Sequence, residues 1–355
     1  MSNELKIPVF DGHNDTLLSI YRPKAGEERD FFAQSEYGHI DLPRARAAGF
    51  AGGFFAVYVP AQHGSASLGK PPESGPYEAP LPEPLDADYA LRFTMGMAAT
   101  LFRIEAESQG QFRVTRDVAA IEQAMADDAI AAILHIEGAE AIDAKLDHLY
   151  VLYQAGLRSI GPVWSRSNIF GHGVPFAYPR TPDTGPGLTD AGKALVRACN
   201  ELRILIDLSH LNEAGFWDVA ALSKAPLVAT HSNVHALSQV SRNLTDKQLD
   251  AIRDSDGMVG LNFAVSFLRE DGRSDKDTPL DVMVAHIDYL VERLGIERVG
   301  FGSDFDGATM PQEIGDVAGL PRLLAALRNR GYDESALRKL AYENWLAVLR
   351  RTWGE

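Results

Sequence analysis

Six side chains that can bind a metal ion or carry a proton stand at the ends of short apolar runs. They are His13, Asp15, Glu137, His210, His231 and Asp304. One histidine in such a place is more often a structural residue, but repetition at the ends of five separate runs makes that explanation improbable for the whole set. If the runs are parallel strands, their carboxyl ends meet at one edge and the six side chains converge.

The chemistry that these residue types favour is metal-assisted hydrolysis. Three imidazoles and two carboxylates precede Asp304 in the chain, and they are too many ligands for one four-coordinate ion. The single cysteine, Cys199, excludes a structural thiolate zinc site. Two ions roughly 3.5 Å apart, bridged by a carboxylate and a hydroxide, would use every group. Glu137 is the expected bridge, and Asp304 then remains as a proton carrier.

The elements that position these side chains form a repeating pattern. Apolar runs rich in Val, Ile, Phe and Ala predict strands that are covered on both faces. Amphipathic segments at 86–109, 188–203, 245–257 and 280–295 predict helices between them, several with Thr or Asp caps. This alternation predicts an α/β protein, a (β/α)8 barrel of the TIM type. The eight predicted strands span residues 8–13, 52–59, 130–137, 159–164, 204–210, 226–232, 258–263 and 298–304.

Three connections are too long and irregular to be simple turns. They cover residues 60–85, 171–187 and 268–278, and we expect these inserted loops to surround the carboxyl-terminal mouth of the barrel. Internal repeats, low-complexity segments and breaks in composition are absent from the sequence. We therefore predict a single domain over residues 1–355 rather than two domains.

The composition argues against two classes of binding partner. The chain has 355 residues, with 34 Lys and Arg against 49 Asp and Glu, and its formal charge of -15 argues against nucleic acid and anionic membranes as partners. The first ten residues lack the pattern of a secretory signal, and no apolar stretch approaches the roughly 18 residues of a membrane span. One cysteine cannot form an internal disulfide, so we expect a cytoplasmic protein.

The motifs around the six side chains resemble those of the membrane (renal) dipeptidase family, metallopeptidases of the amidohydrolase type. The segment EGAEAIDAKLDHLYVLYQAGLR at 137–158 is similar to the signature of that family. DGHND, IDLSH, ATHSN, SRNLTD and GFGSDFDG match its other landmarks in the same order. The resemblance covers nearly the full length. It implies a (β/α)8 barrel with two zinc ions that cleaves dipeptides, and a homodimer.

Matched residue by residue, the resemblance assigns the metal ligands. It makes His13 and Asp15 ligands of one zinc and Glu137 the bridging carboxylate. His210 and His231 become the ligands of the second zinc. A hydroxide between the two metals is then the expected nucleophile.

The resemblance also assigns two residues that act on the substrate. Asp304 becomes the general base and acid, which takes a proton from the attacking hydroxide or water and delivers it to the departing amine. Asp306 competes for this role because both carboxylates lie in SDFDG. Arg242, in SRNLTD, matches the arginine that holds the terminal carboxylate of the substrate, although a surface salt bridge is the alternative.

The chain departs from the family pattern at one position that is expected to contact the substrate. Mammalian members read Leu-Thr-His after the signature, whereas this chain reads PVW at 162–164, so that Trp164 replaces the histidine. An indole donates one hydrogen bond but carries no positive charge. Arg166, Asn168 and His172 follow closely, and each is a candidate for substrate binding as well as for a purely structural role.

The remaining polar residues allow more than one interpretation. His135 shares a strand face with Glu137 and either lines the barrel beneath the metals or is a hydrogen-bonded core histidine. Asp207 is a candidate to orient a ligand imidazole. The other histidines have no visible partners and are interpreted as surface or packing residues; they are His39, His63, His148 and His286.

Together these observations predict a zinc-dependent dipeptidase that hydrolyses short L-Xaa-L-Xaa or L-Xaa-D-Xaa dipeptides with two zinc ions per chain. One alternative is another amidohydrolase reaction at the same binuclear site, such as hydrolysis of N-acyl amino acids, lactones or β-lactams. A second alternative is a metal-dependent binding protein without catalytic activity. The presence of Asp304 argues against the second, since binding alone needs no proton carrier.

Overall fold

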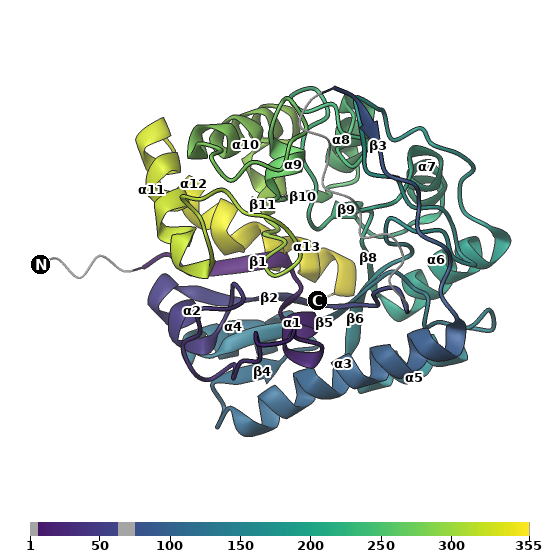
Figure 1. Ribbon diagram of the computed structural model, residues 1–355, viewed down its shortest axis with the longest axis horizontal. Coiled ribbons are helices and arrows are strands. Elements are labelled where there is room, and N and C mark those ends of the chain that lie inside the picture. Colours follow the sequence, from purple (N-terminus) through teal and green to yellow (C-terminus); the bar gives the residue numbers. More distant parts are fainter. Residues whose placement is uncertain (1–5, 63–74, 355) are drawn as a thin grey trace, which may run out of the picture.

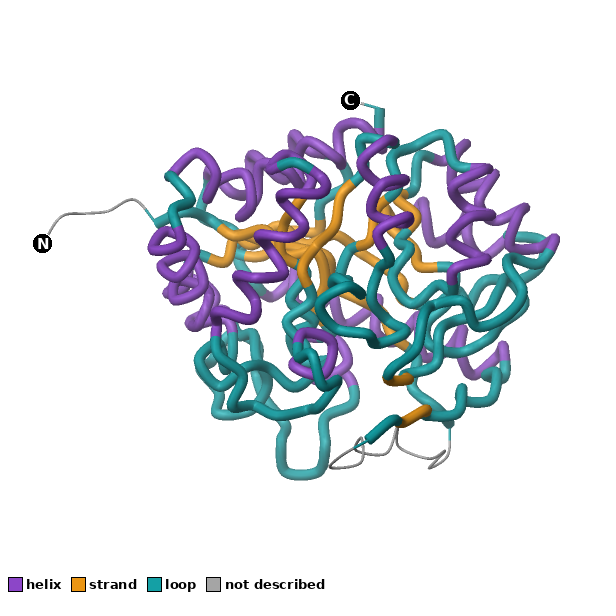
Figure 2. Tube along the Cα trace, turned by 90° about the horizontal axis from the view of Figure 1, so that it is seen from above, coloured by secondary structure: helices purple, strands orange, loops and turns teal. Residues whose placement is uncertain are grey.

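The computed structural model describes residues 6–62 and 75–354. At its centre, parallel strands curve into a nearly closed barrel with helices around it (Figures 1 and 2). The barrel strands are β1 (Val9–Asn14), β2 (Phe50–Tyr58), β5 (Ile130–Glu137), β6 (Leu157–Gly161), β8 (Leu205–Ile206), β9 (Val228–Ala229), β10 (Met258–Leu261) and β11 (Val299–Phe301). Their order is β8-β6-β5-β2-β1-β11-β10-β9, and a parallel bridge from Asp207 to Val228 joins the two ends. The predicted (β/α)8 fold is confirmed.

All eight predicted strands are present, but three of them, β8, β9 and β11, are much shorter than predicted. β8 and β9 contain two residues each, where the sequence predicts seven. The Asp207 carboxylate explains the early end of the ladder, because it accepts hydrogen bonds from the backbone N–H groups of Ser209 and Thr230. The Asp207 side chain thus accepts hydrogen bonds that a neighbouring strand would otherwise accept, at the point where the site begins.

The helices lie around the barrel and cover the outer faces of the strands (Figure 1). The four helices that the sequence predicts are confirmed, and two of them have the predicted caps: Asp86 accepts from Tyr89 N and Thr189 from Gly192 N. The helices are α1 (Thr16–Tyr21), α2 (Leu42–Ala48), α3 (Ala87–Glu107), α4 (Val118–Ala126), α5 (Asp147–Ala155), α6 (Asp190–Leu202), α7 (Glu213–Leu222), α8 (Asp246–Asp254), α9 (Val265–Leu268), α10 (Leu280–Leu294), α11 (Leu320–Arg330), α12 (Glu334–Arg338) and α13 (Asn344–Trp353). Short single turns occupy Ile296–Arg298, Val317–Gly319 and Lys339–Glu343.

One end of the barrel interior is filled by large apolar side chains. Phe10, Phe54 and Trp345 are buried together there, and the Trp345 indole donates a hydrogen bond to Phe301 O. Gly12 allows this close packing, since a Cβ atom at that position would lie 2.4 Å from the Trp345 ring. With this end closed, polar chemistry is confined to the opposite end, where the strands finish.

The described parts of the three long connections lie together at that opposite end, where Figure 2 shows many loops below the barrel. Two of them pair through an antiparallel ribbon of β3 (Tyr77–Glu78) and β7 (Ala177–Tyr178). The Tyr77 hydroxyl donates to Gly272 O and so joins the third connection. A further short strand, β4 (Phe112–Val114), extends the sheet beside β5. Within the described ranges, no helix is long and apolar enough to cross a membrane.

A buried histidine makes the stability of the fold sensitive to pH. His286 on α10 accepts a hydrogen bond from Val234 N through Nδ1, and its Nε2 lies 2.9 Å from Leu268 O. Burial lowers the pKa of His286 to about 4. The unfolded chain therefore binds this proton first as the pH falls from about 6.5 to about 4, and the folded state loses stability across that window.

We expect the His286→Gln variant to show a shallower loss of stability in this window than the wild type. The slopes of unfolding free energy against pH should differ by up to about 1.4 kcal/mol per pH unit, because Gln keeps a donor and an acceptor but cannot titrate. Urea unfolding at a series of pH values measures both slopes. Parallel profiles for the two proteins would show that His286 is not the titrating group.

Candidate functional site

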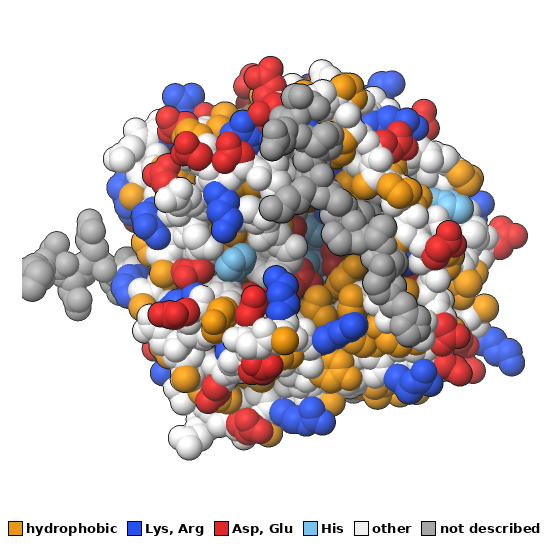
Figure 3. Space-filling model, in the orientation of Figure 1, with side chains coloured by type: hydrophobic (Ala, Val, Ile, Leu, Met, Phe, Trp, Pro, Cys, Tyr) orange, Lys and Arg blue, Asp and Glu red, His pale blue; other side chains and the backbone are white. Residues whose placement is uncertain are grey.

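A pocket of about 730 Å³ opens at the carboxyl ends of the barrel strands. Figure 3 shows the hollow in the centre of the visible face, with acidic and histidine side chains inside it. Of the six side chains predicted to bind metal or carry a proton, four line it: Asp15, Glu137, His210 and Asp304. All three long connections also contribute to its lining, which confirms that they surround the mouth.

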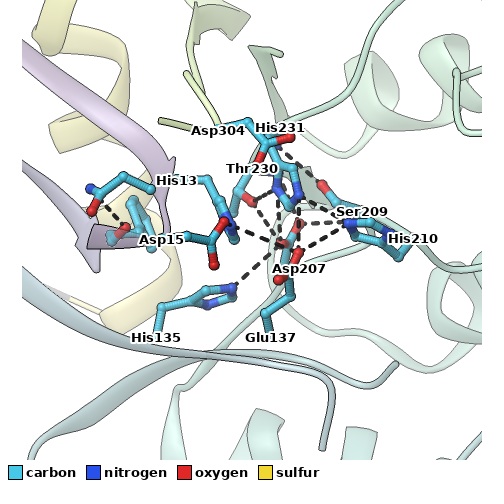
Figure 4. Close-up of polar contacts among 12 residues, drawn as sticks. His13, Asp15, His135, Glu137, Asp207, Ser209, His210, Thr230, His231 and Asp304 are labelled. Atoms are coloured by element: carbon cyan, nitrogen blue, oxygen red, sulfur yellow. Dashed lines mark hydrogen bonds and ion pairs between the residues drawn. The ribbon is translucent and has the colours of Figure 1, made fainter. Parts of the chain in front are cut away.

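The predicted metal ligands converge on the Glu137 carboxylate, as Figure 4 shows. Glu137 Oε1 lies 3.0 Å from His210 Nε2, 3.2 Å from His231 Nε2 and 3.7 Å from His13 Nε2. His13 Nε2 is also 3.4 Å from Asp15 Oδ2. Residues that are more than a hundred positions apart thus present five ligand groups to one small volume, with Glu137 between the two predicted pairs.

The donor atoms in this volume fit divalent metal ions. His13, Glu137 and His231 form one set of ligand atoms that lie within 4.8 Å of one another, and His13, Asp15 and Asp304 form a second. Both ring nitrogens of His13 and Oδ1 of Asp15 are buried without a hydrogen-bond partner among the described residues. Buried polar atoms are rarely left unpaired, so these atoms point to ligands outside the chain. Imidazole and carboxylate donors without thiolates suit zinc.

Hydroxyl groups orient two of the imidazoles toward Glu137. Ser165 Oγ lies 2.8 Å from His210 Nδ1, and Thr230 Oγ1 lies 2.8 Å from His231 Nδ1. Thr230 Oγ1 donates its own proton to Asp207 Oδ2, so it accepts from His231 Nδ1–H. This arrangement leaves His231 Nε2 unprotonated and available as a ligand.

Asp207 was predicted to orient a ligand imidazole, and it acts on His231 through Thr230. Sequence reasoning missed Ser165 and Thr230, although Thr230 stands directly before His231. It also missed Gly307, where a Cβ atom would lie 2.1 Å from Asp15 Oδ2 and 2.4 Å from Asp304 Oδ1. Any side chain at position 307 would therefore displace these two carboxylates.

Burial and neighbouring charges set the protonation of the ligands. Burial raises the pKa of Glu137 and lowers the pKa of His210 and His231 well below its ordinary value. Burial also lowers the pKa of His13, but the carboxylates of Glu137 and Asp15 outweigh it and raise this pKa to about 10. The site thus attracts positive charge, and a bound metal ion would replace the proton of His13.

His135 lies beneath these ligands in the barrel, as one of its two interpretations predicted. Its Nδ1 is 2.9 Å from Ser159 Oγ, and its ring packs edge-on against His13 with centroids 5.5 Å apart. Burial lowers its pKa to about 3, so the ring is neutral at physiological pH. His135 therefore supports the floor of the site as a packed, neutral imidazole.

The structure separates the roles of Asp304 and Asp306. Asp304 Oδ2 accepts a hydrogen bond from Asn262 Nδ2 at 2.9 Å, and no described residue donates to its Oδ1. Asp306 accepts from three donors: Thr16 Oγ1, Arg29 Nη2 and His39 N. Its carboxylate is therefore committed to holding the chain together, whereas the role of Asp304 as the proton carrier stays a prediction.

His39 has partners that the sequence did not indicate. Its Nδ1 accepts from Asp306 N at 2.8 Å, and its own N–H donates to Asp306 Oδ1 at 2.7 Å. It is a packing residue, as predicted, but one that fastens the loop before α2 to the mouth of the barrel. Of the other histidines in that group, His63 lies outside the described residues, and His148 is partly exposed with Nδ1 2.9 Å from Ala141 O.

Breaking the buried Arg29–Asp306 pair should destabilise the protein strongly. Nη2 of Arg29 lies 3.1 Å from Asp306 Oδ2, and both side chains are at most 3% exposed. The Arg29→Met variant leaves the Asp306 carboxylate buried without its cation, so we expect a loss of about 3–5 kcal/mol in the free energy of unfolding.

The exposed pair of Arg330 and Asp288 gives a matched control. Its N–O distance is 2.7 Å, but the Arg330 side chain is 62% exposed. The Arg330→Met variant should lose only about 0–1 kcal/mol. Urea unfolding measures both, and equal small losses would mean that the Arg29 pair does not anchor the loop.

Arg242 lies behind the pocket rather than on its lining. It is buried, and its two terminal nitrogens donate to Ser232 Oγ and to His231 O. Its Nε has no partner among the described residues, and its guanidinium lies 5.8 Å from the centre of the Phe267 ring. Its predicted role as the holder of the substrate carboxylate stays a prediction.

The predicted substrate contacts near Trp164 take different places. Trp164 and Arg166 line the pocket. Asn168 does not line it; its amide donates to Pro162 O and accepts from Phe170 N, which shapes the loop. His172 is also outside the lining, with Nδ1 3.0 Å from Ser167 Oγ. The structure thus brings Trp164 to the pocket but not Asn168 or His172, whose roles in substrate binding stay predictions.

A parallel (β/α)8 barrel with a cluster of histidines and carboxylates at its mouth defines the class of barrel metallohydrolases. Comparison with known proteins places the chain within this class. The model of the membrane dipeptidase family, Peptidase family M19, matches residues 4–353. The chain belongs to this family of metallopeptidases.

Similar proteins and structures agree with this assignment. A crystal structure of a metallo peptidase from Rhodobacter sphaeroides, liganded with a phosphinate mimic of the dipeptide L-Ala-D-Ala, is 54% identical with a TM-score of 0.93. That match covers 98% of this chain and 100% of the other. The structure of dipeptidase AC, also of family M19, is 54% identical with a TM-score of 0.92 and covers 99% and 100%. An uncharacterized protein in the pqqA 5' region of Klebsiella pneumoniae is 53% identical over 72% of this chain and 94% of its own length.

Proposed function

We propose that the protein is a zinc-dependent dipeptidase that binds two zinc ions and hydrolyses L-Xaa-L-Xaa and L-Xaa-D-Xaa dipeptides. The observation that carries this proposal is the position of Glu137 Oε1, within 3.7 Å of three imidazole nitrogens, one from β1 and two from the segments that follow β8 and β9. The L-Ala-D-Ala mimic bound to the similar Rhodobacter sphaeroides enzyme supports the class of substrate.

The ligands divide into two groups around a shared carboxylate. His13 and Asp15 would hold one zinc, His210 and His231 the other, and Glu137 would contact both. When bound, the two ions supply a nucleophilic hydroxide at neutral pH and polarise the scissile carbonyl.

The remaining side chains would orient the peptide and move its proton. Asp304 Oδ1 faces no donor of the described chain, so it is available to take a proton from the attacking water and deliver it to the departing amine nitrogen. Asn262 holds the other oxygen of Asp304 and thereby fixes the direction of Oδ1. Arg242 would attract the terminal carboxylate of the dipeptide from its place beside Phe267.

We further propose that residues 1–355 act as one domain in the cytoplasm, with a small peptide as substrate. The match of the family model to residues 4–353 supports the single domain. A pocket of about 730 Å³ has room for a dipeptide, and its carboxylates favour a substrate with a free ammonium group.

A substrate panel tests this function. The zinc-loaded protein should cleave free L-Ala-L-Ala and L-Ala-D-Ala, and cleave their C-terminal amides at least about tenfold more slowly, because an amide offers Arg242 no charge. N-acetyl amino acids should be poor substrates. Faster cleavage of N-acetyl amino acids, lactones or β-lactams than of dipeptides would assign the site to another amidohydrolase reaction.

A further inference from the structure

One side of the pocket is a continuous wall of four aromatic side chains: Tyr58, Trp164, Phe176 and Phe267. The ring centroids are 4.9 Å apart for Tyr58 and Trp164, 5.8 Å for Trp164 and Phe176, and 5.7 Å for Phe176 and Phe267. All four side chains are half-buried and line the pocket. We call this surface the aromatic wall.

The aromatic wall stands beside the reacting centre. The ring of His210 is 5.8 Å from the Trp164 ring and 6.2 Å from the Phe176 ring. The pocket carboxylates Asp15 and Asp304 follow β1 and β11, which are neighbours in the barrel, whereas Trp164 follows β6, three strands from β1. Trp164 therefore lies on the His210 side of the pocket, away from the strands that Asp15 and Asp304 follow.

Buried polar contacts of Arg166 hold one end of the wall in place. The Arg166 guanidinium lies 5.2 Å from the centre of the Trp164 ring and 5.9 Å from that of Tyr58. Arg166 is 1% exposed, and its Nη1 donates to Val59 O at 3.1 Å and to Glu140 Oε1 at 3.2 Å. Because these contacts fix Arg166, the two rings above it are preorganised rather than mobile.

A rigid aromatic surface beside the scissile bond selects for apolar partners. Covering its exposed ring area with an apolar side chain removes both surfaces from water, whereas a charged side chain would lose hydration against the rings. We propose that the aromatic wall binds an apolar side chain of the dipeptide, aromatic or large aliphatic, and makes such dipeptides preferred over alanyl-alanine. This inference rests on the proposed dipeptidase function.

The test compares kcat/KM of the zinc-loaded enzyme for L-Phe-L-Ala, L-Ala-L-Phe and L-Ala-L-Ala. At least one phenylalanine dipeptide should exceed L-Ala-L-Ala about tenfold or more. In the Trp164→Ala variant this ratio should fall by about tenfold, and in Trp164→Phe, which keeps a ring, it should stay near the wild-type ratio. Trp217, on α7 and 37% exposed, gives the control: the Trp217→Ala variant should keep the wild-type ratio.

A binding measurement separates this inference from the function on which it rests. Phosphinate mimics of L-Phe-D-Phe, which has phenylalanine at both positions, and of L-Ala-D-Ala should differ about tenfold in Kd, and Trp164→Ala should remove the difference. Equal kcat/KM values for all three dipeptides, or an equal loss for all of them in Trp164→Ala, would overturn the role of the wall while the dipeptidase function stands. If no dipeptide is cleaved, the proposed function is wrong, and the two Kd values alone decide whether the wall selects apolar groups.

Discussion

Replacing Glu137 by Gln should abolish the activity and reduce the zinc content to about one ion per chain or less. A neutral amide cannot supply the negative charge that faces the nitrogens of His13, His210 and His231. Metal ions contribute several kcal/mol to such a reaction, so kcat should fall by at least about 10³-fold. Elemental analysis and dipeptide hydrolysis measure the two effects on the same preparation.

The fold should survive this change, which gives the control. Glu137 is buried, and an amide of the same shape fits the same space in the metal-free protein; removing the cost of burying its charge offsets the lost attraction to His13. The metal-free variant should therefore unfold at the same urea concentration as the metal-free wild type, or at a higher one. A Glu137→Gln protein that binds two zinc ions and hydrolyses dipeptides at the wild-type rate would contradict the assignment of the bridge.

Replacing Asp304 by Asn should have a large effect on the rate without loss of zinc. Asn keeps an oxygen that can accept from Asn262, but it cannot take up a proton at neutral pH. We expect kcat to fall by about 10²–10⁴-fold, the usual contribution of a general acid–base group. The zinc content should stay near two per chain, because the proposed role of Asp304 is proton transfer and not metal binding.

Asp306 provides a matched comparison from the same loop. The Asp306→Asn variant loses an ion pair with Arg29, so it should be less stable than the wild type, but its kcat should fall less than about tenfold at a temperature where it is folded. If instead Asp304→Asn hydrolyses dipeptides as fast as the wild type and Asp306→Asn does not, the roles of the two carboxylates are reversed.

The sequence predicts the barrel and the convergence of the candidate ligands well, because both depend on local pattern. A run such as IAAILHIE is apolar except for His135 and ends in a carboxylate, so it predicts both a covered strand and the place of Glu137. The structure has this strand at Ile130–Glu137. Parallel strands share one carboxyl edge, so the convergence of His13, His210 and His231 follows from the fold class alone.

What the sequence does not predict depends on contacts between distant segments. Nothing near His210 in the chain indicates that Ser165, 45 residues earlier, holds its Nδ1. Likewise, the pairing of His39 with Asp306 spans 267 residues, and the sequence leaves His39 without a partner. Such hydrogen bonds are set by how the loops pack at the mouth, which local propensity does not encode.

In the loop after β6, the sequence also fails to predict which of several neighbouring side chains face the pocket. Trp164, Arg166, Asn168 and His172 lie close together in the sequence, and all were candidates for contact with the substrate. The backbone turns between them, since Arg166 N donates to Trp164 O and Asn168 N to Gly171 O. Trp164 and Arg166 therefore face the pocket, while Asn168 and His172 bond within the loop.

The most direct test of the central claim is the zinc content of the purified protein, measured together with dipeptide hydrolysis before and after chelation. We expect about two zinc ions per chain, loss of cleavage when a chelator removes them, and recovery of cleavage when zinc is restored. A protein that binds no metal after careful handling, or that cleaves dipeptides equally well without metal, would contradict the assignment of His13, Asp15, Glu137, His210 and His231 as a binuclear site.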